Sequence, residues 1–265
     1  METTRITGER IREYMLSGKR FDGRNLEDFR EITIEKGVSK NAEGSARVKI
    51  GNTEVVVGVK MSVSEPYPDS PDKGNLMVTS ELLPLSSDRF ESGPPRIESI
   101  ELARVIDRCI RESKFIEFEK LCITPGEKVW TVFVDIYSIN ADGNLIDAAG
   151  IGALAALKNA KIPEYNEKEG VVYGSLTNKK IPVKKEIPLS ITFHKIGESI
   201  IVDPTQEEED VSEARVTIGS HEGVISSMQK GNSKEIKEDE MFKILDLNEK
   251  VWKELFLKIE KSFKD

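Results

Sequence analysis

Acidic side chains gather in one short stretch of the second half of the chain, Asp203-Pro204-Thr205-Gln206-Glu207-Glu208-Glu209-Asp210. Carboxylates bind divalent cations and act as general acids, so this stretch has the residue types of a hydrolytic or phosphorolytic site. A strand pattern, Ala214-Arg215-Val216-Thr217-Ile218, follows it. Consecutive carboxylates in a loop are nevertheless typical of a solvated edge, and we expect no metal site here.

A second stretch has the composition of a phosphate-binding helix start, Asp147-Ala148-Ala149-Gly150-Ile151-Gly152-Ala153-Leu154. We expect Asp147 to cap a helix that runs to about Ala160. Glycines at a helix start can present backbone N–H groups to an anion. A lone Gly-x-Gly is weak evidence for phosphate, however, and Ile151 has neither a donor nor a charge. We therefore interpret this helix start as packing.

Three arginines form the third candidate group. Arg104, Arg108 and Arg111 lie on a helix predicted over 97–113, within about 60° of one another around its axis. Guanidinium groups match the geometry of phosphate, so the stripe could guide an RNA backbone. Acidic residues at helical spacing could pair with the arginines instead: Glu101, Asp107 and Glu112. Spacing alone leaves both interpretations open.

Composition limits the class of protein. Thirty-nine basic and forty-seven acidic side chains give a net charge of −8, which argues against binding nucleic acid through overall charge. An RNA ligand would need a local basic strip or a partner subunit. No apolar run approaches the ~20 residues of a membrane span, and no signal-peptide core is present. Only Cys109 and Cys122 could form a disulfide, so we expect a reducing cytoplasm. Neither His194 nor His221 belongs to a nucleophile motif, and we expect His194 to be structural.

The elements that must position these groups are mixed helices and strands. Helices are predicted over 5–17, 97–113, 147–160 and 238–261. Strands are predicted over 29–36, 45–50, 53–63, 74–85, 129–139, 189–196, 199–202, 214–218 and 224–228. A Pro- and Lys-rich stretch over 179–188 marks a boundary. Lys49–Thr53 and Lys195–Ser199 read as two similar strand-turn-strand units, which indicates a duplicated α+β architecture.

The first third of the chain carries a more specific pattern. Ser17-Gly18-Lys19-Arg20-Phe21-Asp22-Gly23-Arg24 precedes a hairpin in which Gly44–Ile50 and Glu54–Val59 flank a tight Gly51-Asn52 turn. In this order and spacing, the set resembles the N-terminal signature of the RNase PH family, the phosphate-dependent 3′-to-5′ exoribonucleases. The resemblance implies an α+β, RNase PH-like fold (ribosomal protein S5 domain 2-like), with duplicated strand-turn-strand and helix layers. It divides the chain into an N-terminal helix and arm (1–28), a first domain (29–165) and a second domain (186–265).

The resemblance also implies that catalytic groups are missing. Catalytic members carry a Gly-Gly-Thr-Arg-like run, and by position Gly150-Ile151 replaces its Thr-Arg pair. They also carry two aspartates six residues apart, where this chain has Glu209 and Arg215. A guanidinium stays protonated and can be neither a general acid nor a magnesium ligand. We expect no catalytic residue and no cofactor.

Within the family, the chain is most similar to the non-catalytic RNase PH-like subunit of the archaeal exosome. The tracts that carry this similarity are Gly74-Asn75-Leu76, Glu81–Leu85, Gly93-Pro94-Pro95, Ile100–Arg108, Val129–Val132 and Val202–Thr205. The similarity implies a six-membered ring of three heterodimers with the catalytic RNase PH-like subunit, RNA as ligand, and RNA-binding cap proteins, with no membrane. It assigns Arg104 and Arg108, but not Arg111, to the RNA path.

Two other functions stay open on the sequence. The chain could be an autonomous phosphorolytic exoribonuclease that uses Asp203 with Glu209 or Asp210. It could also be an unrelated small-molecule enzyme with similar layers, although no motif supports that function. An autonomous enzyme would work alone and depend on those carboxylates, whereas a structural subunit would be inert alone.

Overall fold

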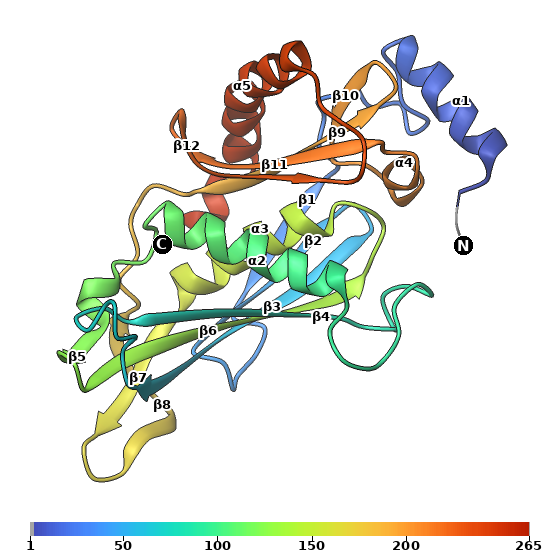
Figure 1. Ribbon diagram of the computed structural model, residues 1–265. Coiled ribbons are helices and arrows are strands. Elements are labelled where there is room, and N and C mark those ends of the chain that lie inside the picture. Colours follow the sequence, from blue (N-terminus) through green and yellow to red (C-terminus); the bar gives the residue numbers. More distant parts are fainter. Residues whose placement is uncertain (1–2, 265) are drawn as a thin grey trace.

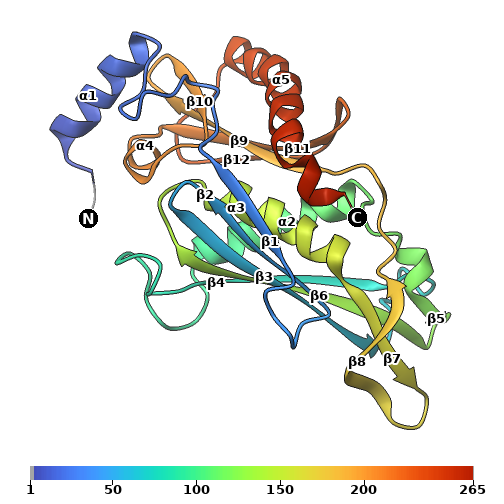
Figure 2. The same cartoon turned by 180° about the vertical axis from the view of Figure 1, so that it is seen from behind.

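The chain stacks two β-sheets with helices between them and one long helix on the outside (Figures 1 and 2). A computed structural model describes residues 3–264. No helix in this range is long and apolar enough to cross a membrane. The layers follow the duplicated α+β architecture predicted from the sequence.

The first sheet has the strand order β1-β2-β3-β6-β4, with the short β5 paired to β6. Its strands are β1 (Ile32–Lys36), β2 (Gly44–Ile50), β3 (Thr53–Ser64), β4 (Asn75–Leu82), β5 (Cys122–Thr124) and β6 (Lys128–Asn140). Only β4 runs parallel to its neighbour, β6. In β3, Val55, Val57, Val59 and Met61 alternate with more exposed residues, so one face of the sheet is apolar and packs on helices.

Helices α2 (Ile97–Glu112) and α3 (Leu145–Asn159) lie between the two sheets. α3 is buried almost all round because it contacts both the first sheet and β9 of the second. Small residues permit this close packing. A Cβ on Gly152 would lie 2.8 Å from Val57 Cγ2, and a Cβ on Gly150 would collide with Ser190 Oγ. The interpretation of these glycines as packing residues is therefore confirmed.

The second sheet has the order β10-β9-β11-β12, formed by β9 (Leu189–Ile196), β10 (Ser199–Val202), β11 (Ala214–His221) and β12 (Val224–Gly231). The long helix α5 (Glu238–Phe263) covers its outer face through Ile244, Val251 and Leu255. The two predicted strand-turn-strand units are both antiparallel hairpins. Gly51 and Gly197 turn them with φ of 56° and 59°.

The N-terminal helix α1 (Arg5–Leu16) stands at the edge of the second domain, beside the short helix α4 (Gln206–Asp210). The prediction of a loop over 203–210 is partly wrong, because α4 occupies its second half. Thr205 and Glu208 close a capping box that starts α4. The sequence offered this signal, since Thr205 is followed three residues later by Glu208.

Two further predictions need correction. Asp147 does not cap α3, because Asn144 takes the cap position in a left-handed conformation (φ 59°) and the helix begins two residues earlier than predicted. The hairpin of β7 (Lys161–Asn166) and β8 (Gly170–Lys180) was not predicted, and it projects from the first domain (Figure 1). The 3₁₀ turn Phe118–Leu121 precedes β5.

Candidate functional site

Arg104 and Arg108 both project from α2 into solvent. Arg108 Nη1 lies 3.5 Å from Gln229 Oε1 on β12, a long contact with a neutral group. Within residues 3–264, no carboxylate forms an ion pair with either guanidinium. Arg111 differs, because it donates to Asp107 at 2.8 Å and 3.1 Å and to the carbonyl of Leu76 at 3.1 Å. The structure thus separates the two arginines assigned to the RNA path from the third.

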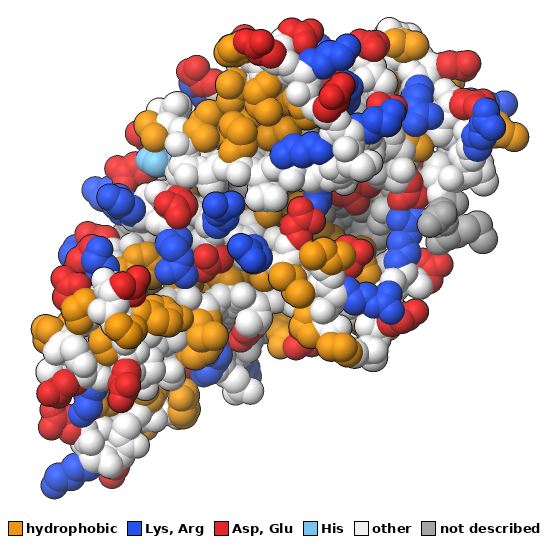
Figure 3. Space-filling view, in the orientation of Figure 1, with side chains coloured by type: hydrophobic (Ala, Val, Ile, Leu, Met, Phe, Trp, Pro, Cys, Tyr) orange, Lys and Arg blue, Asp and Glu red, His pale blue; other side chains and the backbone are white. Residues whose placement is uncertain are grey.

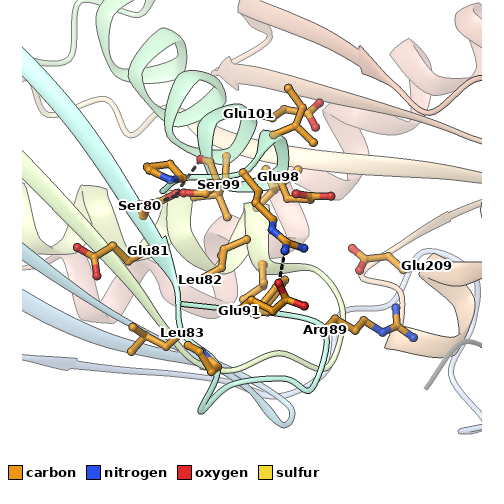
Figure 4. A pocket seen from close by; sticks show the side chains of 18 of the residues that line it. Ser80, Glu81, Leu82, Leu83, Arg89, Glu91, Glu98, Ser99, Glu101 and Glu209 are labelled. Atoms are coloured by element: carbon orange, nitrogen blue, oxygen red, sulfur yellow. Dashed lines mark hydrogen bonds and ion pairs between the residues drawn. The ribbon is translucent and has the colours of Figure 1, made fainter. Parts of the chain in front are cut away.

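A cleft of about 820 Å³ lies between the two domains, next to the start of α2 (Figure 4). The first domain contributes the end of β4, the 83–96 loop and the first turns of α2. The second domain contributes His194, α4 and Arg215. Figure 4 shows Glu98 and Glu101 on the α2 side, with Arg89 and Glu209 at the α4 side. Charged groups of both signs therefore line the cleft.

The start of α3 reaches this cleft with apolar side chains. Leu145 and Ile146 line it, whereas Ile151 is buried in the core. That Gly150-Ile151 stands where catalytic relatives hold phosphate stays a prediction, although α3 begins earlier than expected and brings Leu145 and Ile146 to the cleft. The chemical conclusion is unchanged, since neither Leu145 nor Ile146 offers a charge or a side-chain donor.

Glu209 and Arg215, the predicted counterparts of the two catalytic aspartates, both line the cleft. Arg215 Nη2 lies 2.5 Å from Glu101 Oε2 and is mostly buried. Burial raises the pKa of Glu209. The hydrogen bond that Glu209 accepts from the backbone N–H of Asn144 at 3.1 Å lowers this pKa, but the effect of burial is larger. One guanidinium and one buried carboxyl group thus stand in this cleft at the two predicted positions, and the guanidinium of Arg215 can be neither a general acid nor a magnesium ligand.

Two other acidic residues of 203–210, Asp203 and Asp210, have structural partners. Asp203 is fully buried and accepts hydrogen bonds from Arg24, Arg30 and Asn144. Asp210 binds Arg89, and its pKa falls to about 2, because hydrogen bonds from Arg89 and Thr3 outweigh the effect of burial. In the described part of the chain, no group of three or more His, Cys, Asp or Glu side chains could hold a metal ion. The geometry gives no support to an autonomous enzyme that would use Asp203 with Glu209 or Asp210.

The N-terminal signature folds over the second domain. Arg20 forms a buried ion pair with Glu208, where Nε donates to Oε1 at 2.9 Å, and it also binds the carbonyls of Val202 and Asp203. Arg24 and Arg30 both reach Asp203, at 2.9 Å and 2.8 Å. The arginines of this arm therefore fix α4 and the bend before it. Their roles could not be read from spacing, because their partners lie more than 170 residues away.

Burial shifts the pKa of two titratable groups, Asp147 and His194, toward the neutral form. Burial raises the pKa of Asp147 to about 7, although Thr192 donates to it through Oγ1 at 2.8 Å and through its backbone N–H at 3.2 Å. Burial, with the charge of Arg215, lowers the pKa of His194 to about 3, and its Nδ1 lies 3.0 Å from Ser212 Oγ. Asp147 thus connects α3 to β9, whereas His194 connects β9 to the residues before β11, which fits the structural role predicted for His194.

Comparison with known families decides the relationship. A model of the 3′ exoribonuclease family, domain 1, matches residues 28–163, and one of the same family, domain 2, matches residues 186–251. The chain belongs to the RNase PH family. The predicted family resemblance and the predicted RNase PH fold are confirmed. The finer domain boundaries, 29–165 and 186–265, stay a prediction.

Curated relatives of this RNase PH chain cover nearly its full length. The exosome complex component Rrp42 of Methanothermobacter thermautotrophicus is 47% identical over 244 residues, 91% of this chain and 90% of that protein. Its counterpart from Thermococcus gammatolerans is 48% identical over 244 residues, 91% of this chain and 89% of that protein. The predicted similarity to the archaeal exosome subunit is thereby confirmed.

Solved structures show the same RNase PH fold. A chain of the Archaeoglobus fulgidus exosome with RNA bound to the active site matches with a TM-score of 0.86 and 43% identity, over 96% of this chain and 99% of that chain. A chain of an archaeal exosome core matches with a TM-score of 0.81 and 40% identity, over 98% of each chain. Rice Rrp46, at 17% identity and a TM-score of 0.70 over 92% of this chain and all of that chain, shares the fold alone.

Proposed function

We propose that this chain is the non-catalytic, Rrp42-type component of an archaeal exosome ring. The observation that carries the proposal is the Arg215–Glu101 ion pair in the cleft, where a catalytic paralogue needs an acid. An arginine at the position of the second aspartate stays protonated and cannot protonate a leaving 3′ oxygen from there. The chain is not itself a nuclease, and it acts through its partner.

The proposed partner is the catalytic RNase PH-like subunit, in a ring of three heterodimers with cap proteins. What supports it is similarity to exosome components over more than nine-tenths of the chain. The rigid core between the two sheets suits a subunit that must hold a neighbour's groups in place. The cytoplasm is the proposed compartment, since Cys109 and Cys122 are free thiols.

A phosphorolysis assay tests this function directly. The purified chain, given phosphate and poly(A), should release no nucleoside diphosphate. The catalytic paralogue of the same organism, mixed with the chain, should release more than the paralogue alone, because the chain completes the partner's active site. Robust release by the chain alone would contradict the proposal, and so would a mixture no more active than the paralogue.

We propose that Arg104 and Arg108 bind RNA phosphates beside the partner's active site. The double variant Arg104→Ala/Arg108→Ala should weaken RNA binding by the assembled ring. The slope of log K against log salt should become shallower by about 1.4, the value for two phosphate contacts on a single strand. Filter binding at several salt concentrations measures both effects, and gel filtration checks assembly.

Arg5→Ala/Arg10→Ala on α1 is the matched control, because it removes the same charge from exposed side chains of another helix. It should leave both the affinity and the slope unchanged. Unaltered RNA affinity in the assembled Arg104→Ala/Arg108→Ala ring would refute the assignment of these two residues.

A further inference from the structure

The Lys-rich segment after β8 lies directly beside the end of α2. The backbone N–H of Lys184 donates to the carbonyl of Phe115 at 2.8 Å, and that of Glu117 donates to Pro182 at 2.9 Å. A β-bridge pairs Ile116 with Val183 between these contacts. Residues 182–184 are therefore fixed against the chain that leaves α2, although nearly 70 positions separate the two segments in sequence.

Basic side chains continue from α2 onto this segment. Lys114 follows the last turn of α2, and Lys184 and Lys185 follow the bridge, all three exposed. Within residues 3–264, none of the three lysines forms an ion pair with a carboxylate. We call Arg104, Arg108, Lys114, Lys184 and Lys185 the basic strip. From Arg104 to Lys114 it extends ~15 Å along the helix axis, which is long enough for more than one phosphate.

The acidic groups near the strip do not cancel its charge. Asp107 is held by Arg111 in a two-point ion pair, and Glu117 is paired with Lys120 at 2.7 Å. Glu112 and Glu186 stay exposed beside it. Figure 3 shows Lys and Arg side chains in a band across this face, over α2 and toward its C-terminal end, with fewer acidic side chains between them. The band is local, because the chain as a whole is acidic.

We propose that Lys114, Lys184 and Lys185 bind the phosphates of RNA upstream of the nucleotides that Arg104 and Arg108 contact. This inference rests on the proposed function, in which α2 lies on the RNA path. Lysine suits the task because its ammonium group meets phosphates without a fixed orientation, so it can follow a single strand of any sequence. RNA long enough to pass the end of α2 then gains contacts that a short RNA does not reach.

The test measures RNA binding by the reconstituted ring with Lys184→Ala/Lys185→Ala, using a short and a long 5′-labelled oligoadenylate in the absence of phosphate. The long RNA should bind more weakly, with a salt slope shallower by about 1.4. That change of slope makes the deficit about sevenfold smaller at 200 mM than at 50 mM salt. The short RNA should bind as tightly as it does to the unaltered ring.

Lys36→Ala/Lys40→Ala is the matched control, since both lysines are exposed at the far end of the first sheet. It should change the affinity of the ring for neither the short nor the long RNA. Charge reversal, Lys184→Glu/Lys185→Glu, provides a second variant and should enlarge the deficit for the long RNA only. Equal affinities for the long RNA in all variants would overturn the strip proposal.

Failure of the strip and failure of the proposed function give different results. One result is that Arg104→Ala/Arg108→Ala lowers the affinity for the short RNA while the lysine variants leave the affinity for the long RNA unchanged. In that case only the extension past α2 is wrong. If neither pair changes any affinity in an assembled ring, RNA does not follow α2 and the RNA-contacting part of the proposed function fails as well. Equal weakening of both RNAs by the lysine variants would place the lysines near the 3′ end and contradict an upstream contact.

Discussion

Asp203→Ala should lower the free energy of unfolding by about 3–5 kcal/mol, the cost of leaving buried charges without a partner. The carboxylate of Asp203 accepts from Arg24 Nη1 at 2.9 Å, from the backbone and Nε of Arg30 at 2.7 Å and 2.9 Å, and from Asn144 Nδ2 at 2.8 Å. Its removal leaves the guanidinium groups of Arg24 and Arg30, which lie mostly out of water, without this anionic partner. Thermal unfolding should show a transition roughly 10 °C lower for a chain of this size.

The effect of Asp203→Ala should depend on pH in a defined direction. Burial opposes ionisation of Asp203, but the hydrogen bonds and charge of Arg30 outweigh it and hold its pKa below the usual value. A carboxyl group with a lowered pKa in the folded state stabilises above its unfolded pKa, and this contribution is lost as the pH falls through the folded pKa. The difference in the free energy of unfolding between Asp203→Ala and the unaltered chain should reach its full size at neutral pH. It should shrink below about pH 4.

Asp72→Ala supplies the matched control for Asp203→Ala. Asp72 is an exposed carboxylate in the loop before β4, and its replacement should change the unfolding free energy by less than about 0.5 kcal/mol. Asp203→Asn keeps one acceptor oxygen and should fall between the two. Equal stability of the Asp72→Ala and Asp203→Ala chains would show that the arm arginines find other partners.

The sequence predicted the elements of this fold well where periodicity is long. α5 and α2 begin at the predicted residues and end within two residues of the prediction, because apolar positions recur through several turns. The β7–β8 hairpin was missed because its strands are polar and mostly exposed, so alternation between polar and apolar residues is weak there. Its fixed position rests on tertiary contacts such as the edge-to-face contact of Trp130 with Tyr165.

The site was predicted in its chemistry but not in its geometry. That Glu209 and Arg215 stand six residues apart is visible in the sequence, and the structure brings both to one cleft. The start of α3 was placed too late, because an asparagine in the left-handed conformation caps it and the buried Asp147 resembles a cap in sequence. The partner of Arg215 was not predicted at all, since Glu101 lies 114 residues away on α2.

Gly143→Ala should destabilise the chain by about 3 kcal/mol or more, through both backbone strain and a clash. Gly143 has φ of 79° in the turn before α3. A Cβ there would collide with the carbonyl oxygen of Pro204 and lie 2.6 Å from the carbonyl carbon of Thr205 and 2.8 Å from the backbone nitrogen of Gln206. Backbone atoms at the start of α4 cannot swing aside as a flexible side chain would. Chemical denaturation measures the loss.

Gly126→Ala separates strain from clash, because Gly126 has nearly the same φ, 78°, and a Cβ added there would meet no atom within 4 Å. It should cost only about 1–2 kcal/mol, the strain of a left-handed alanine. If Gly143→Ala lowered the free energy of unfolding no more than Gly126→Ala, the close approach of the two domains at this turn would not restrict residue 143. If it is worse, α4 must shift away from α3. Glu209 and Arg215 then move with α4 and the strand after it.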